Sequence, residues 1–283
     1  QIGIGTKIST VAQQFMQGNI TSTNNSLDIA INGGGFFRMS NNGSVTYSRN
    51  GQFQMDKLGY IVDAEGKRLT GYVANASGVL STGAPTEIMI NTADLTPLAS
   101  TEITGLFNLD STKSTLPAAS FDPTDPTTYH NSTAVTVYDS LGNAHTLQSF
   151  FVKTAPGTWN VFATVDGVST PALPGSTATM TFTGTGLNPT VVPATPSVTF
   201  SPTTGATSPQ SVTLDFSGTT QFGSAFSVNS LSQDGYTSGH LAGFNIGKDG
   251  RIVGRYTNGQ SATLAQVVLA NFSNPNGLQQ LGN

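Results

Sequence analysis

The sequence contains no cysteine and few charged residues. The absence of cysteine excludes disulfides, thiolate metal sites and cysteine nucleophiles. Charged residues account for 9% of the chain, against roughly 25% in typical globular domains; Ser, Thr, Asn, Gly and Gln fill the gap. Because Lys, Glu and Arg are also good helix formers, their scarcity favours strands over helices. A polar but uncharged surface is typical of secreted β-rich assemblies.

Basic clusters and long apolar runs are also missing. The net charge is −4 and no run of basic residues occurs, which argues against nucleic acid or an anionic membrane as a partner. The apolar runs are a few residues long, far short of the roughly 20 residues that span a bilayer. No signal-peptide pattern is present. Because the first residue is Gln1, we expect the chain to be an excised piece of a longer protein.

Short segments with strand periodicity make up most of the chain. Residues 27–31 alternate between apolar and polar or small side chains, which predicts a half-buried strand. Strands are predicted next at 36–39 and 45–49, joined by a turn at Asn41-Asn42-Gly43, because Asn and Gly tolerate positive φ. Similar units recur every eight to ten residues, as in antiparallel β domains. Residues 8–15 instead have helical spacing and predict one or two turns of amphipathic helix.

Charge divides the chain into an insert and its flanks. Residues 97–225 hold two basic and seven acidic side chains, whereas residues 1–96 and 226–283 together hold nine basic and eight acidic ones. This shift predicts an outer domain at 97–225, inserted into a discontinuous inner domain made by the two flanks. Segments of the insert also alternate between apolar and polar residues, which predicts a β-sandwich or barrel. The expected fold is therefore all-β, with two domains.

Histidines and glycine-rich loops carry no recognisable chemistry. His130, His145 and His240 lack the spacing of metal ligands. Gly33-Gly34-Gly35 resembles a phosphate loop only superficially, because it lacks a following Lys and opens onto a strand instead of a helix. No Gly-x-Ser-x-Gly elbow is present. We therefore predict no metal, no cofactor and no nucleophilic catalysis.

Two further patterns favour structure over catalysis or sugar binding. The closest carboxylate pairs, Asp122 with Asp125 and Asp63 with Glu65, occur in Pro- or Gly-containing turns. Asp is favoured in such turns because its side chain caps the backbone, so a turn role outweighs a glycosidase pair. Trp159 could form a sugar platform, but a single Trp on an alternating strand is more typical of a core. The chain is therefore not expected to be an enzyme.

A first group of motifs comprises Leu27-Asp28-Ile29-Ala30-Ile31, Gly35-Phe36-Phe37-Arg38 and Tyr47-Ser48-Arg49-Asn50-Gly51-Gln52-Phe53. In combination these motifs resemble the bacterial flagellar rod and hook family. The second group, Val135-Thr-Val-Tyr-Asp-Ser-Leu-Gly-Asn143 with Trp159, is similar to the outer domain of the hook members. A third, Gly250-Arg-Ile-Val-Gly-Arg-Tyr256 followed by Gln266-Val-Val-Leu-Ala-Asn-Phe272, is similar to the same members. The resemblance covers most of the chain and is weakest at 168–210.

The resemblance implies a structural subunit of the flagellar hook, the curved flexible tube that acts as a universal joint and transmits motor torque to the filament. Such a subunit works by self-assembly and sliding contacts. It would be exported by the flagellar type III system and act outside the cell. Its implied partners are other hook subunits, the hook cap, the distal rod and the hook–filament junction proteins. Family members carry helical terminal segments, which this sequence lacks, so a core fragment is expected.

The family motifs mark a set of residues with expected structural roles. Aromatic members are assigned to packing, and Asp28 and Arg49 to holding turns or a neighbouring subunit. The insert is expected to face outward and slide along the hook axis. A distal rod subunit and a secreted carbohydrate-binding or adhesin module remain as alternatives. The full set of motif residues is Leu27, Asp28, Gly35, Phe36, Phe37, Tyr47, Arg49, Gly51, Phe53, Tyr138, Asp139, Gly142, Tyr256 and Phe272.

Overall fold

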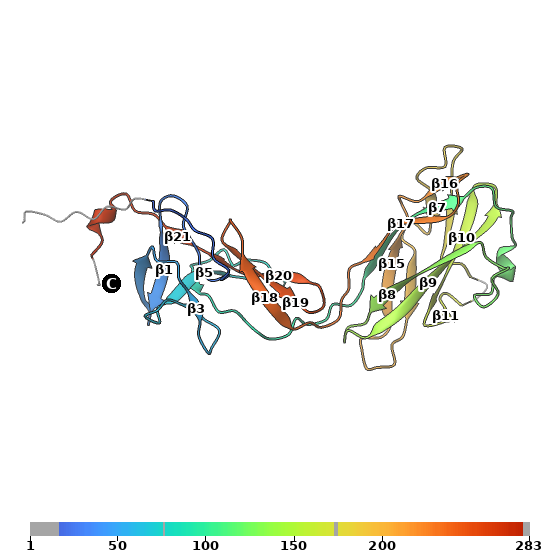
Figure 1. Cartoon of the computed structure of the whole chain (residues 1–283). Helices are drawn as coiled ribbons and strands as arrows, with labels where there is room; N and C mark the ends of the chain where they lie inside the picture. The colour runs from blue at the N-terminus through green and yellow to red at the C-terminus, as the bar shows by residue number, and fades with distance from the viewer. Residues whose placement is uncertain (1–16, 76, 173–174, 280–283) are drawn as a thin grey trace, which may run out of the picture. The chain divides into compact units, whose positions relative to one another are not determined.

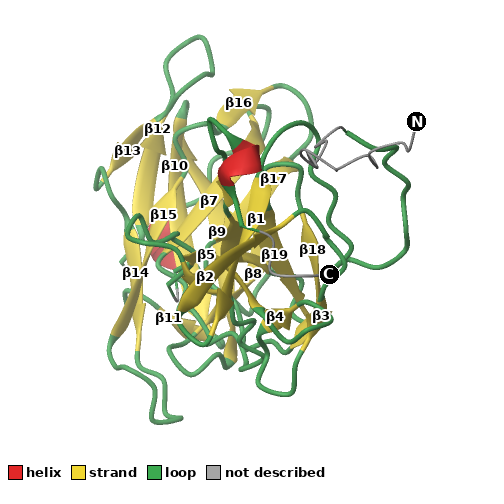
Figure 2. Cartoon of the chain, turned by 90° about the vertical axis from the view of Figure 1, so that its left-hand side faces the viewer, coloured by secondary structure: helices red, strands yellow, loops and turns green. Residues whose placement is uncertain are grey.

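The computed structural model describes residues 17–75, 77–172 and 175–279. Their regular secondary structure is almost entirely strands, which loops and turns connect (Figures 1 and 2). The helix predicted at 8–15 lies outside them. The predicted all-β class is confirmed. The chain divides into two compact units, the first made of Gln1–Asp94 with His240–Asn283 and the second of Leu95–Gly239. Within the described ranges, no helix is long and apolar enough to cross a membrane.

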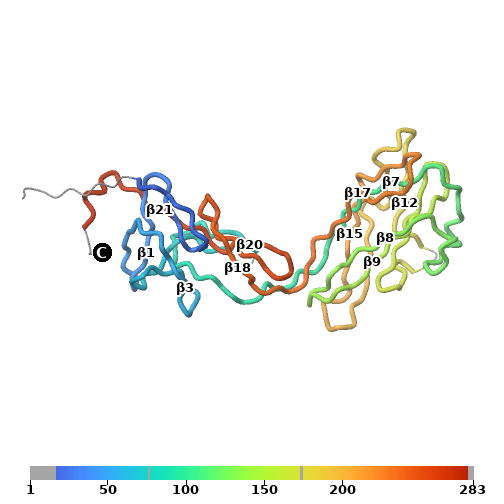
Figure 3. Tube along the Cα trace, viewed as in Figure 1, coloured from blue at the N-terminus to red at the C-terminus, as the bar shows by residue number. Residues whose placement is uncertain are grey.

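One ten-stranded sheet system builds the first unit and joins its two chain segments. Strands β18-β19-β20-β5-β1-β2 follow one another, and β5 pairs antiparallel with β20. Figure 3 shows these early and late parts of the chain side by side. The main strands are β1 (Phe36–Asn41), β2 (Ser44–Ser48), β5 (Arg68–Val73), β18 (Leu241–Ile246), β19 (Arg251–Tyr256) and β20 (Ser261–Val267). Shorter elements are β3 (Gln54–Met55), β4 (Ile61–Val62), β6 (Thr86–Glu87), β21 (Leu269–Ala270) and the 3-10 turn η2 (Pro275–Gly277).

Two sheets form the second unit. One has the order β13-β12-β10-β9-β8 with β11 beside β10, and the other has β14-β15-β7-β16 with β17 beside β7. The first sheet comprises β8 (Asn131–Tyr138), β9 (Ala144–Ala155), β10 (Thr158–Val165), β11 (Val168–Ser169), β12 (Ala178–Thr181) and β13 (Thr190–Val192). The second comprises β7 (Glu102–Asp110), β14 (Ser197–Phe200), β15 (Gln210–Asp215), β16 (Thr220–Phe222) and β17 (Ser227–Gln233); the 3-10 turn η1 spans Ala118–Ser120.

Each unit has its own hydrophobic core. In the second unit, side chains from both sheets pack around Trp159, which is fully buried and donates its indole Nε1–H to Oε1 of Gln221 at 2.6 Å. The prediction that Trp159 belongs to a core is therefore confirmed. In the first unit, Phe37, Met39 and Leu69 are buried together with Ile252 from the late segment. Burial of apolar surface stabilises the folded state by roughly 25 cal/mol per Å². Each unit is therefore stabilised by a core of its own.

The late boundary of the insert differs from the one predicted at residue 225. Strand β17 pairs antiparallel with β7, and the second unit extends to Gly239. Residues 226–239, which the sequence analysis gave to the inner domain, therefore lie in the second unit. No charged residue occurs between Asp215 and Asp234, so the change in charge could not locate this boundary.

The predicted strand at 27–31 forms a single bridge instead of a ladder. Asp28 pairs with Gln52 in an isolated antiparallel bridge. The expected alternation is nevertheless present, since Leu27 and Ile31 are buried while Asp28 and Ala30 are exposed. Alternation of apolar and polar side chains indicates which face of a segment is buried. It does not indicate how many backbone hydrogen-bond pairs the segment makes with a neighbouring strand.

Candidate functional site

A close backbone contact joins the two ends of residues 27–53, the stretch that holds the first group of family motifs. The amide of Ile29 donates to the carbonyl of Gly51 at 2.8 Å, and the amide of Phe53 donates to the carbonyl of Leu27 at 3.2 Å. A Cβ atom built on Gly51 would lie only 1.6 Å from the carbonyl oxygen of Ile29. The family-motif glycine at 51 is therefore required because no side chain fits between the two segments.

Aromatic motif residues line the core side of the same stretch. Phe37 is 1% exposed, and its ring packs edge-on against Phe53 with centroids 5.2 Å apart. Leu27 belongs to the same buried cluster. Phe36 is also buried, on the edge of the ring of Phe272 at 5.9 Å. These placements support the packing role expected of the aromatic residues.

Replacing Phe37 by alanine is expected to lower the free energy of unfolding of the first unit by about 3–5 kcal/mol, because the change removes a fully buried ring and leaves a cavity. Chemical denaturation followed by far-UV circular dichroism measures this loss. Tyr47→Ala is the matched control, since Tyr47 is 38% exposed, and a loss below about 1 kcal/mol is expected there. Equal losses in the two variants would contradict the packing role of Phe37.

Polar motif residues in this stretch bind local backbone and side chains. Asp28 accepts hydrogen bonds from Thr23 Oγ1 at 2.8 Å and from Asn25 Nδ2 at 3.0 Å. Arg49 donates through Nη2 to the carbonyl of Gly33 at 2.7 Å. Both side chains thus fasten the turns on either side of the Ile29–Gly51 contact. A role in contacting a neighbouring subunit stays a prediction.

The remaining motif residues of the first unit lie at the end of β1 and in the late segment. Gly35 adopts a φ of +119°, which favours glycine, and lies against the carbonyl of Ala270. Phe272 is half-buried, and its ring packs edge-on against Tyr47 at 4.7 Å. Tyr256 is buried at the end of β19. The early and late motifs thus meet partly through rings, which sequence spacing alone does not reveal.

In the second unit, the motif turn after β8 is organised by the buried carboxylate of Asp139. Its Oδ1 accepts from the amides of Leu141 and Asn143, each at 2.9 Å, and its Oδ2 accepts from Asn143 Nδ2 and Thr204 Oγ1, also at 2.9 Å. Burial alone would raise the pKa of Asp139, but these hydrogen bonds outweigh it and hold the pKa well below its ordinary range. The side chain therefore remains an ionised acceptor and fixes the turn.

The other two motif residues of this turn bring separate segments into contact. Gly142 has a φ of +81°, and a Cβ there would lie 2.8 Å from Cβ of Pro97. Tyr138 receives hydrogen bonds at its carbonyl from the Ser100 amide and from Gln210 Nε2, each at 2.9 Å. Motif residues 138–142 therefore connect the β8–β9 turn to the segment just before β7 and to the start of β15.

A histidine between two carboxylates lies beside this turn, and the sequence analysis missed it. His145 Nδ1 lies 2.6 Å from Oδ2 of Asp166, and its Nε2 lies 3.5 Å from Oδ2 of Asp139. The strand order β10-β9-β8 brings the turns after β8 and β10 to the same end of the sheet. Burial would lower the pKa of His145, but the hydrogen bonds that the protonated ring donates to both carboxylates outweigh it and raise the pKa.

This cluster predicts a pH dependence of the second unit's stability. The raised pKa of His145 adds stability that is present below pH 6.5 and lost as pH rises through the raised value. The lowered pKa values of Asp139 and Asp166 add stability that is present above pH 3.8 and lost as pH falls through the lowered values. We therefore expect the melting temperature of the second unit to fall as the pH rises through the raised pKa of His145. In His145→Gln this fall should be smaller.

The melting temperature of the wild-type chain minus that of His145→Gln reports the contribution of His145 alone. His130 is present in both proteins, and its burial lowers its pKa, so its contribution to the pH dependence has the opposite sign. The melting temperature is to be measured from pH 4 to 9 by the fluorescence of Trp159, the single tryptophan of the chain. Parallel curves for the wild-type chain and His145→Gln would contradict the role of the cluster.

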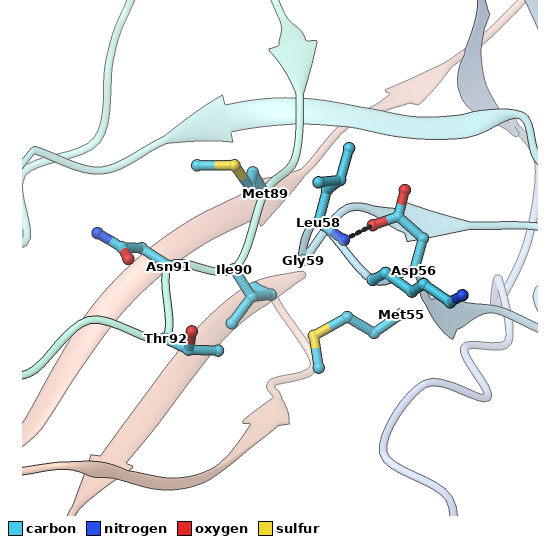
Figure 4. Close-up of a pocket in the computed structure, with 9 residues that line it drawn as sticks. Met55, Asp56, Leu58, Gly59, Met89, Ile90, Asn91 and Thr92 are labelled. Atoms are coloured by element: carbon cyan, nitrogen blue, oxygen red, sulfur yellow. Dashed lines mark hydrogen bonds between the residues drawn. The ribbon is translucent and has the colours of Figure 1, made fainter.

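The hollows and carboxylate pairs do not combine into a ligand site. A hollow of about 470 Å³ in the second unit is within the roughly 300–1,000 Å³ of ligand pockets, but no ionisable side chain lines it. A hollow of about 180 Å³ in the first unit, shown in Figure 4, is smaller than this range. Its carboxylate, Asp56, accepts from the amides of Leu58 at 2.8 Å and Tyr60 at 2.9 Å, so it caps a turn. The lining residues are Met55, Asp56, Lys57, Leu58, Gly59, Met89, Ile90, Asn91 and Thr92.

Turn roles are also observed for the carboxylate pairs considered above. Asp63 Oδ1 accepts from the amides of Glu65 at 3.0 Å and Lys67 at 2.9 Å. Asp122 and Asp125 each accept from the residue two positions later. Within the ranges that the structure describes, no three His, Asp or Glu side chains are grouped to hold a metal ion.

Comparisons with known proteins assign both units to one class. The family model "Flagellar hook protein FlgE/F/G D1 domain" matches residues 30–104, and "Flagellar basal body protein FlaE D2 domain" matches residues 108–236. The second match includes β17, in agreement with the boundary found in the structure. A strand-built unit of the first kind that carries an inserted unit of the second kind defines an axial protein of the bacterial flagellum.

Within this class, the individual relatives that match the chain are hook proteins. The flagellar hook protein FlgE of Salmonella typhimurium is 36% identical over 288 residues, which cover 100% of this chain and 70% of the relative. The FlgE of Escherichia coli is 35% identical over 289 residues, with the same coverage. The crystal structure of Helicobacter pylori flagellar hook protein FlgE2 shares the fold, with a TM-score of 0.64, 14% identity and coverage of 91% of each chain. The chain belongs to the flagellar hook protein family.

Proposed function

We propose that this chain is a subunit of the curved flagellar hook and that it works by self-assembly, without catalysis. The observation that carries the proposal is the 36% identity to a hook protein over the whole chain, through both units. The motif residues that resembled the family fasten turns and fill cores, as a structural subunit requires. Its proposed partners are other hook subunits, the hook cap, the distal rod and the hook–filament junction proteins.

The surface chemistry supports a tube that bends. Adjacent subunits in a bending tube must shift against one another without leaving their places. Ser, Thr, Asn and Gly offer weak, exchangeable and often water-mediated hydrogen bonds, whereas ion pairs are more strongly directional. In residues 17–75, 77–172 and 175–279, only four ion pairs join Lys or Arg to a carboxylate. We infer that sliding contacts of this polar kind let the hook act as a universal joint.

Export and position follow from the same proposal. The subunit leaves the cell through the flagellar type III system and acts outside it, at the hook. The second unit faces outward and slides along the hook axis, while the first unit sets the radial packing. The second unit also favours a hook subunit over a distal rod subunit, since the rod is stiff and most rod members lack such an outer domain.

Immunogold electron microscopy on the bacterium that encodes this chain tests the proposal. Antibodies raised against the purified chain are expected to label the hook along its whole length, and a strain that lacks the gene is the control. Label on the rod alone, or on the cell surface in cells whose hooks stay unlabelled, would overturn the assignment. The second of these outcomes would favour an adhesin.

A further inference from the structure

The two units carry opposite net charge. The first unit, residues 1–94 and 240–283, has nine basic and seven acidic side chains, a net of +2. The second unit, residues 95–239, has two basic and eight acidic side chains, a net of −6. Like charges that gather on one body repel each other, and pairing them with the opposite sign on another copy removes that cost. A contact between the first unit of one copy and the second unit of another would therefore be favoured.

The first unit has an exposed sheet face with two arginines, which we call the arginine face. Arg251 and Arg255 lie four residues apart on β19, so they point to the same face about 13 Å from each other. Ser261 of β20 is opposite Arg255, and Gln266 is opposite Arg251. Residues directly opposite in an antiparallel pair share a face. Asn245 and Val253 are also paired on this face, which is therefore polar and basic.

The core lies on the other side of these strands. Ile252 and Ala265 are fully buried opposite each other on β19 and β20, whereas Arg251 and Arg255 are exposed. Arg251 pairs with Asp249 at 3.3 Å, although both side chains remain more than half exposed. Among the described residues, no hydrogen bond or ion pair of the Arg255 side chain is present. The arginine face thus offers another molecule the guanidinium of Arg255 and, beside it, the exposed guanidinium of Arg251, which is paired only with an exposed carboxylate.

A rigid pair of exposed carboxylates lies in the second unit, in the turn Asp122-Pro-Thr-Asp125. Asp122 Oδ1 accepts from the Thr124 amide at 2.8 Å and from Thr124 Oγ1 at 2.7 Å. Asp125 Oδ1 accepts from the Thr127 amide at 2.9 Å and from Thr127 Oγ1 at 2.7 Å. These bonds use one oxygen of each carboxylate, and both residues are exposed. Within the described ranges, neither carboxylate has a cationic partner.

Four of the other six acidic groups of the second unit are already engaged, among them Asp110, whose Oδ2 lies 4.0 Å from Nζ of Lys113. Asp139 is buried in its turn, and Asp166 is bound to His145. Asp234 accepts from the amides of Thr101 and Glu102. The turn Asp122–Asp125 therefore supplies the concentrated negative charge that the arginine face could bind.

We propose that the arginine face of one copy binds the Asp122–Asp125 turn of a neighbouring copy in the hook. The contact rests on the proposed function, because it requires the chain to polymerise. Exposed ion pairs of this kind contribute little to affinity and are screened by salt, but they set which partner and which orientation are chosen. The contact therefore guides neighbours into place and still allows them to shift when the tube bends.

Charge reversal in the full-length hook protein, expressed from its own gene, tests the contact. Arg251→Glu/Arg255→Glu and Asp122→Lys/Asp125→Lys are each expected to reduce the number of hooks per cell about tenfold, because like charges then face each other. The four substitutions together restore opposite charges and are expected to restore most hooks. Lys57→Glu and Glu102→Lys, which each reverse one charge of the same sign at another exposed site, are expected to leave hooks intact.

Two readouts separate assembly from folding and export. The purified chain with Arg251→Glu and Arg255→Glu should melt as the wild type does, because both side chains are exposed. The chain with Asp122→Lys and Asp125→Lys loses the caps of one exposed turn and should melt slightly lower while remaining folded. Both variants should be secreted in normal amounts. Normal hook numbers in both double variants would overturn the contact, as would a combined variant that restores none. Failure of the antibody to label wild-type hooks would instead overturn the proposed function.

Discussion

Replacing Asp139 by alanine is expected to lower the free energy of unfolding of the second unit by about 2–3 kcal/mol. The change removes the acceptor of the Leu141 and Asn143 amides, of Asn143 Nδ2 and of Thr204 Oγ1. A donor left without a partner costs about 1–3 kcal/mol when it is buried. These four hydrogen bonds are only half-buried, and Leu141, Asn143 and Thr204 are exposed, so water recovers much of that cost.

Trp159 provides the measurement, because it is the only tryptophan and lies in the core of the second unit. Urea unfolding followed by its fluorescence gives the free energy of unfolding of this unit. Asp139→Asn is the matched variant, because it keeps one acceptor oxygen, and about half the loss is expected. An Asp139→Ala protein that loses less than about 1 kcal/mol would show that the turn does not depend on the carboxylate.

Gly51→Ala is expected to cost more than about 4 kcal/mol, or to prevent the first unit from folding. The added methyl group would lie 1.6 Å from the carbonyl oxygen and 2.8 Å from the carbonyl carbon of Ile29. Both atoms belong to the backbone, so the clash is relieved only by separating the two segments and losing the hydrogen bond between Ile29 and Gly51. Gly34→Ala is the control, since no atom lies within 4 Å of a Cβ built there.

Hydrogen exchange of the amides in β1, β2 and β5 measures this effect locally. Rapid exchange is expected in Gly51→Ala, whereas the fluorescence transition of Trp159 should stay close to that of the wild type, because Trp159 lies in the other unit. Slow exchange in Gly51→Ala, equal to that of Gly34→Ala, would refute the close contact.

Local signals in the sequence predicted local structure well. The turn at Asn42 and Gly43 has φ values of 48° and 93°, and it joins β1 to β2 as expected. Trp159 is buried as its alternating strand indicated. Such features depend on a few neighbouring residues, whose turn preferences and polarity are written directly in the sequence.

Features that depend on contacts between distant residues were missed or misplaced. The His145–Asp166 pair spans 21 residues and exists only because β8, β9 and β10 are neighbours in one sheet. The end of the second unit is set by the pairing of β17 with β7, more than 100 residues away. The ring contact between Tyr47 and Phe272 likewise joins the two ends of the chain. No periodicity within one segment encodes these pairings.

The family motifs acquire a physical meaning from the structure. Gly51 and Gly142 mark places where another segment comes too close for a side chain, and Asp139 organises a turn. Phe37 and Phe53 fill the core of the first unit. These positions preserve the shape of each unit, so the contacts between subunits must be sought on other surfaces, such as the arginine face.

The central claim is that the second unit controls how the hook bends, while the first unit suffices for the tube. The Leu95 amide donates to the Gly239 carbonyl at 2.8 Å, and the Gly239 amide donates back to Leu95 at 3.3 Å. Because these residues are paired, residues 96–238 of the full-length protein can be replaced by an Asn-Gly turn, which suits a two-residue hairpin.

Electron microscopy of hooks from cells that express this shortened protein is the most direct measurement. We predict that tubes still assemble, because the shortened protein loses the Asp122–Asp125 turn without placing like charges opposite each other. These tubes are expected to be straight or abnormally supercoiled, and the cells to swim poorly although the subunit is exported normally. Hooks of normal curvature that support normal swimming would contradict the account.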